Sequence, residues 1–213
     1  MPNYFPRRAL LRASLAGLAA ASLRAAVSPA AAASDAAAPI AALNVALTDV
    51  MKAGKDAPFP ARYQTLAPVV AQSFDLAAIL RLVVGPHWAD IPPEMQTALL
   101  AEFHRFTVAS YVANFDDNSG ERLEILPTTH VVGGDTVIET RIVFPKNDPV
   151  RIDYVMREND GHWQVVDVLL DGTISRVAVQ RSDFRHILEA GGPQALITNL
   201  RKKISALSGG TLA

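Results

Sequence analysis

The chain has 213 residues, a formal net charge of −1, and no cysteine. The lack of cysteine excludes disulfides, zinc–thiolate sites and thiol catalysis. The length is enough for one medium domain or two small ones, each with a buried core.

The first 33 residues are predicted to form a cleavable signal peptide. They contain four arginines and no acidic residue, an apolar run from Ala13 to Leu23, and a small-residue tract that ends at Ala33. Such a tract suits signal peptidase cleavage near Ala33. The pair Arg7-Arg8 also resembles a twin-arginine signal, so twin-arginine export and ordinary secretion both remain open. Either route predicts an exported protein, most naturally in a bacterial periplasm.

Removal of these residues leaves a single predicted domain, residues 34–213, with a net charge of about −5. An acidic chain without basic clusters argues against nucleic acid as a partner and against direct adhesion to anionic lipid surfaces. No run of 18 apolar residues follows residue 34, so the mature protein is expected to be soluble.

The first half of the mature chain has the periodicity of helices. After an Ala-rich linker, residues 34–39, apolar residues at helical spacing predict a helix from Ile40 that ends at Gly54. Three more helices are predicted over residues 61–73, 76–84 and 93–115. Asp75 is a suitable N-cap for the third helix, and Pro92 and Pro93 stand where the long fourth helix begins.

At Asp116 the apolar period changes from 3.6 to 2, which predicts strands. Four strands are expected over residues 122–132, 136–144, 150–158 and 162–170, separated by turn sequences such as Asn159-Asp160-Gly161. Short connections imply an antiparallel four-stranded meander. Two closing helices, residues 183–190 and 193–207, complete an α+β fold with its helices packed on one face of the sheet.

The sequence offers little that could perform chemistry. The five histidines show no spacing typical of a metal site, and there is no nucleophile elbow, phosphate loop or dinucleotide fingerprint. Asp153 and Asp167 lie in hairpin-linked strands and could form an acid/base pair of a small hydrolase or isomerase. The structural interpretation is favoured, in which Asp171 serves a turn and the other two pair with arginines across the sheet. We therefore expect no enzyme activity, metal or cofactor.

Several segments together resemble the MlaC/Ttg2D (toluene-tolerance) family of periplasmic lipid-binding proteins. They are Arg62-Tyr63 through Gly85…Trp88, Gln96…Tyr111 on the long helix, Tyr154…Val168, and Phe184…Lys203. Where that family commonly reads Gly-Val-Ser after the tryptophan strand, this chain has Asp171-Gly172-Thr173-Ile174-Ser175. Together with Phe115-Asp116 and Ser119-Gly120-Glu121 after the long helix, this departure resembles the hopanoid-associated HpnM branch.

The resemblance implies a shuttle for phospholipid or hopanoid lipid that works with membrane-bound lipid-transport components of an ABC-transporter-type system. Its lipid pocket is expected between the long helix and the sheet. The predicted lining is apolar and aromatic: Leu80, Val84, Trp88, Leu99, Phe103, Phe106, Ile142, Phe144, Tyr154 and Val168. The alternative is a non-lipid periplasmic adaptor that uses the same apolar surface, which would show a shallow exposed patch in place of a pocket.

Overall fold

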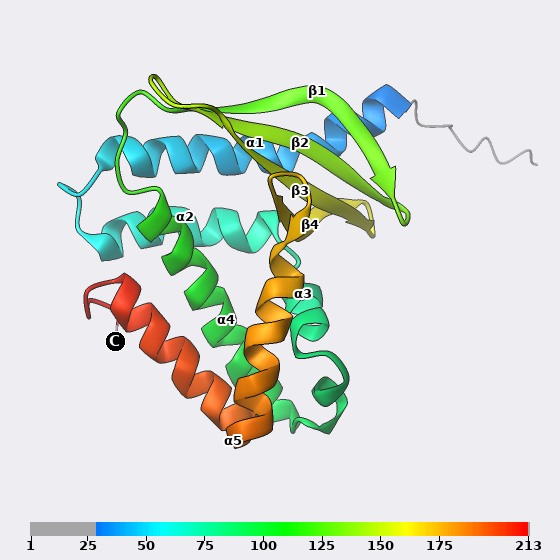
Figure 1. Cartoon of the computed structure of the whole chain (residues 1–213), viewed down its shortest axis with the longest axis vertical. Helices are drawn as coiled ribbons and strands as arrows, with labels where there is room; N and C mark the ends of the chain where they lie inside the picture. The colour runs from blue at the N-terminus through cyan, green and yellow to red at the C-terminus, as the bar shows by residue number, and fades with distance from the viewer. Residues whose placement is uncertain (1–28, 213) are drawn as a thin grey trace, which may run out of the picture.

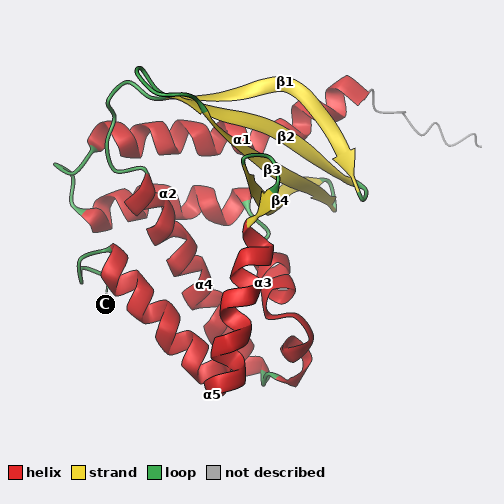
Figure 2. Ribbon diagram, in the orientation of Figure 1, coloured by secondary structure: helices red, strands yellow, loops and turns green. Residues whose placement is uncertain are grey.

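The computed structural model describes residues 29–212. Five helices and a short 3₁₀ turn surround one face of an antiparallel sheet, as Figure 1 and Figure 2 show. Residues 1–28 of the predicted signal peptide lie outside the described part of the chain, so the signal peptide stays a prediction.

The N-terminal helix α1 runs from Pro29 to Ala53. The linker predicted for residues 34–39 is therefore wrong. Alanine has the highest helix propensity, so an Ala-rich segment continues a helix when one face can be buried. Ala36 and Ile40 are fully buried, and Pro39 stays inside the helix.

The stretch Asp35–Ala53 is the one described helix that is long and apolar enough to cross a membrane by length and composition. In the structure its Ile40, Leu43 and Leu47 are buried in the core, and the helix packs against α2 and the sheet. A core helix of a globular domain explains these contacts.

The next helices follow the predictions closely. α2 covers Phe59–Ser73, α3 covers Leu76–Val84, and α4 covers Pro93–Asn114; a 3₁₀ helix, η1, spans Gly85–Asp90. The Asp75 side chain accepts a hydrogen bond from the Ala78 N–H at 2.8 Å, which confirms it as the N-cap of α3.

The sheet is a meander in the order β1-β2-β3-β4-β5. Its strands are β1 Arg122–Val132, β2 Asp135–Val143, β3 Val150–Asn159, β4 His162–Leu170 and β5 Ile174–Ser175. The antiparallel meander is confirmed, but the four-strand count is wrong because β5 adds a fifth strand. Two residues are too few to give a period, so sequence patterning could not find it.

A tight turn creates β5. Asp171 and Gly172 both have positive φ (52° and 70°), and the Thr173 N–H donates to the Leu170 carbonyl at 3.1 Å. This geometry belongs to the two-residue hairpin turns that favour Asp-Gly. The turn folds β5 back onto the end of β4 and delivers the chain to the start of the last helix.

The last helix, α5, spans Arg176–Leu207 and is interrupted by non-helical backbone at Gly191 and Gly192. The two predicted closing helices are therefore present, but the first begins at Arg176 and not at Asp183. Ser175 is its N-cap, since the Ser175 hydroxyl accepts a hydrogen bond from the Ala178 N–H at 2.9 Å. The early start brings the first turns of α5 against the sheet edge, next to α3 and α4.

Candidate functional site

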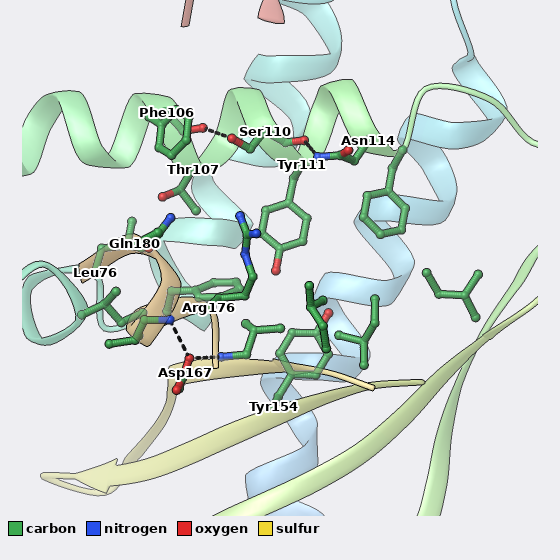
Figure 3. Close-up of a pocket in the computed structure, with 18 of the residues that line it drawn as sticks. Leu76, Phe106, Thr107, Ser110, Tyr111, Asn114, Tyr154, Asp167, Arg176 and Gln180 are labelled. Atoms are coloured by element: carbon green, nitrogen blue, oxygen red, sulfur yellow. Dashed lines mark hydrogen bonds between the residues drawn. The ribbon is translucent and has the colours of Figure 1, made fainter. Parts of the chain in front are cut away.

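An apolar cavity lies between α4, the first turns of α5, and the helix-facing side of the sheet. Its volume is about 570 Å³, and it is open to solvent on part of its boundary. Figure 3 shows side chains from α4 above and from β3, β4 and α5 below converging on this space. The cavity lies between the long helix and the sheet, but it is partly open, so the enclosed pocket of the prediction is not confirmed and lipid binding here stays a prediction.

One stripe of α4 forms the longest wall of the cavity. Its members follow one another at intervals of one or three residues along the helix, so that alternate members are four apart: Phe103, Phe106, Thr107, Ser110, Tyr111 and Asn114. Residues at these intervals share one face of an α-helix. The hydroxyls of Thr107 and Ser110 donate to carbonyls of their own helix, at 2.8 Å each, so they add few unsatisfied polar groups to the wall.

Aromatic rings cluster at the centre of the cavity. The Tyr111 ring lies between Phe74 and Phe115, with ring centroids 5.7 Å and 5.9 Å away. Tyr154 from β3 approaches the same space from the sheet side. Rings at such distances pack favourably and leave flat apolar faces exposed to a ligand.

Both tyrosines line the cavity; Tyr154 is part of the buried core, and Tyr111 packs against that core. Burial raises the pKa of Tyr154 to about 12, and burial together with the neighbouring Tyr154 raises the pKa of Tyr111 well above 10. A raised pKa means that the folded protein keeps these phenols protonated where the unfolded chain ionises them.

This difference predicts a loss of stability at high pH. Tyr154 contributes stability that is present below its unfolded pKa of 10 and is lost as the pH rises to about 12. We expect Tyr154→Phe to remove about 2 kcal/mol of that loss between pH 9 and pH 12, since one pKa unit corresponds to about 1.4 kcal/mol and the folded phenol is half ionised at pH 12. Urea unfolding curves at pH 9 and pH 12 measure it, and identical pH dependence in both proteins would contradict the assignment.

Six of the ten predicted lining residues lie along this cavity, where lipid contact remains a prediction. They are Phe103, Phe106, Ile142, Phe144, Tyr154 and Val168. Further residues of the same elements line the cavity and were not predicted: Leu76 and Ile79 on α3, Ile152 on β3, Leu170 on β4, and Phe74 before α3.

The other four predicted residues lie outside the cavity. Leu80, Val84 and Leu99 are buried in the core, because α3 packs against both α5 and α4 and has almost no polar face. Trp88 is half-buried in η1, where the Gln96 side chain donates to the Trp88 carbonyl at 3.0 Å. This bond joins η1 to the start of α4, beyond the end of the cavity wall.

The two aspartates considered for catalysis do not form a pair. Asp153 pairs across the sheet with Leu169, whereas Asp167 pairs with Val155. Asp153 is fully buried and binds the Arg151 guanidinium at 2.7–3.0 Å. It therefore pairs with an arginine as expected, but with one on its own strand β3, so the expected pairing across the sheet is wrong.

Asp167 lines the cavity but serves the start of α5. It accepts hydrogen bonds from the Ser175 hydroxyl and from the Val177 N–H, the latter at 3.1 Å. The expected pairing of Asp167 with an arginine is therefore wrong, because the free N–H groups at the helix N-terminus take that carboxylate. The arrangement favours binding of apolar material over acid/base chemistry.

Comparisons with known proteins agree with this geometry. A family profile described as MlaC protein matches residues 42–202. The fold is also similar to a solved structure from Ralstonia solanacearum, described as a phospholipid-binding protein in complex with a phospholipid. That match has a TM-score of 0.68 and 18% sequence identity, and covers 82% of this chain and 99% of the other. The comparison with curated proteins gave no match.

The profile covers most of the chain, from the middle of α1 to the last turns of α5. The structural match extends the agreement to the order and packing of helices and strands. This chain belongs to the MlaC protein family.

Proposed function

We propose that this protein is a periplasmic lipid-binding shuttle, which carries phospholipid or hopanoid lipid between membranes together with membrane-bound components of an ABC-transporter-type system. Membership of the MlaC family and the likeness to a phospholipid-binding protein support lipid binding. They also favour a binding protein over an enzyme. The arginine-rich, acid-free N-terminus supports the periplasmic location.

The cavity is the observation that carries the proposal. A cavity of 150 Å³ accommodates benzene, which gives about 25 Å³ per non-hydrogen atom. At that density the 570 Å³ cavity holds roughly 23 such atoms. One acyl chain of about 16 carbons therefore fits inside, and the open side leaves a path for the rest of the lipid.

The energy of such binding is sufficient for a carrier. Transfer of a chain of about 16 carbons out of water contributes on the order of 12 kcal/mol, at about 0.8 kcal/mol per methylene. A membrane offers the same chain a comparable gain. The protein can therefore take up and release lipid without a large net change in free energy, which is what transport between membranes requires.

The choice between phospholipid and hopanoid depends on the sequence after β4. The segment from Asp171 to Ser175, similar to the HpnM branch, forms the tight turn, β5 and the N-cap of α5. It thereby sets the position of the first turn of α5 at the cavity. A rigid polycyclic hopanoid would need this wall to stand further from α4 than a flexible acyl chain does.

The direct test is to identify what the protein carries. We expect the protein, exported in its native host and purified without detergent, to yield lipid on solvent extraction, at close to one molecule per protein by mass spectrometry. Heat-denatured protein passed through the same column serves as the control for adventitious lipid. Absence of co-purified lipid, together with failure to move labelled lipid between two vesicle populations, would contradict the proposal.

A further inference from the structure

The charged side chains around the cavity are unevenly distributed. Among the described residues that line it, Arg176 is the only one with a cationic side chain. The carboxylates are Asp167 and three residues of the loop between α4 and β1, namely Asp116, Asp117 and Glu121. Arg176 therefore lies on a different element from these carboxylates, the first turn of α5.

The carboxylates have partners nearby. Asp167 caps α5, and Asp116 forms an ion pair with Lys55 at 3.1 Å. The other two carboxylates accept hydrogen bonds within their own loop. The Arg176 guanidinium, by contrast, makes no hydrogen bond or ion pair with any side chain or carbonyl in the part of the chain that the structure describes.

The position of Arg176 combines access to the cavity with access to solvent. Figure 3 shows its guanidinium beside the Tyr111 ring, on the cavity side of α5. Its side chain is nevertheless exposed, so it stands where the cavity meets solvent. Gln180, one helical turn later on the same face, also lines the cavity and adds an amide donor.

We propose that Arg176 binds the phosphate of a bound phospholipid, so that the pocket prefers a phosphate-bearing lipid over an uncharged lipid with the same acyl chains. This inference rests on the proposed function. The acyl chain would occupy the aromatic wall, and the headgroup would lie at the rim beside the guanidinium. An arginine presents a planar set of donors that matches two phosphate oxygens at once, which a point charge cannot do.

The experiment compares two lipids within one sample. Full-length mature protein is incubated in nonionic detergent with equal amounts of dipalmitoyl phosphatidylglycerol and dipalmitoylglycerol, and native mass spectrometry measures the ratio of the two bound lipids. The chains are identical, so the ratio reports the headgroup alone. We expect the wild type to prefer the phosphate-bearing lipid by about tenfold, the size of one charge-assisted contact at a partly exposed site.

Three variants assign the preference to Arg176. Arg176→Gln should bring the ratio close to one, and Arg176→Lys should retain part of the preference because the charge stays and the planar fork is lost. Arg185→Gln removes an exposed arginine of the same helix that does not line the cavity, and should leave the wild-type ratio unchanged. A melting curve checks each variant, and if Arg176→Gln does not fold, the Arg176→Lys ratio decides.

The outcomes separate this inference from the proposed function. Equal binding of both lipids by the wild type, or an unchanged ratio in Arg176→Gln, overturns the role of Arg176 while lipid binding stands. Binding of neither lipid overturns both. Displacement of bound phosphatidylglycerol by an equal concentration of inorganic phosphate would identify Arg176 as a site for free anions and would also overturn the inference.

Discussion

Val168→Trp is expected to reduce lipid loading at least tenfold while the protein remains folded. Val168 on β4 faces the cavity opposite the α4 stripe and lies across the sheet from Tyr154. The larger side chain adds about seven non-hydrogen atoms, which at about 25 Å³ each fill roughly 175 Å³. This is close to a third of the 570 Å³ cavity and leaves room for roughly 16 non-hydrogen atoms in place of 23, so an acyl chain of about 16 carbons has no spare volume in which to bend and pack.

The matched control is Val131→Trp, the same substitution at an exposed position of β1 that is 70% accessible. Both proteins should melt within a few degrees of the wild type, because the first fills an existing space and the second adds a ring in solvent. Lipid extracted per mole of protein is the measurement. If Val168→Trp retains the wild-type amount of lipid, the cavity between α4 and the sheet is not the binding site.

The wall formed by α4 could be predicted because its signal is periodic. Phe103 and Phe106 are large apolar residues at an interval of three, on a helix long enough for one face to be read from the sequence. The strands could be predicted for a similar reason, because their period of two is bounded by Asp-Gly and Gly-Gly turns. Both patterns depend only on residues that are near one another in the sequence, so the packing of distant parts of the chain does not alter them.

The face that α3 turns to the cavity could not be predicted. Its sequence is apolar almost all round, so Leu76, Ile79, Leu80 and Val84 are equally good candidates before the neighbours are known. The structure places the first two along the cavity and the last two in the core. Only the positions of α4 and α5, which come from distant parts of the chain, decide between them.

Arg176 was missed for a different reason. The segment from Arg176 to Arg181 has three consecutive apolar residues between polar ones and no clear helical stripe, so the helix was predicted to start at Asp183. A local signal was nevertheless present, because Ser175 is a favoured N-cap residue. An N-cap at Ser175 predicts a helix that starts at Arg176, and so places Arg176 in the first turn of α5, shortly after the Asp-Gly turn.

Arg151→Leu is expected to destabilise the protein by about 3 kcal/mol, because it leaves a buried carboxylate without its cation. Asp153 is fully buried, and the Arg151 guanidinium holds it through both Nε and Nη2. Glu139, which pairs with Asp153 across β2 and β3, contacts the same guanidinium at 3.3 Å. Without Arg151, two neighbouring carboxylates face each other with no positive charge between them. The melting temperature should fall by roughly 6–12 °C for a domain of this size.

Two further variants distinguish this mechanism from a general loss of surface charge. Arg122→Leu removes a more exposed arginine of β1, whose contact with Glu124 is 3.4 Å long, and should cost less than about 1 kcal/mol. The double variant Arg151→Leu/Asp153→Leu removes both charges of the buried pair and should recover most of the stability lost in the single variant. Equal losses in Arg151→Leu and Arg122→Leu would show that the buried carboxylate is not the cause. A double variant that is as unstable as Arg151→Leu would lead to the same conclusion, since it no longer contains that carboxylate.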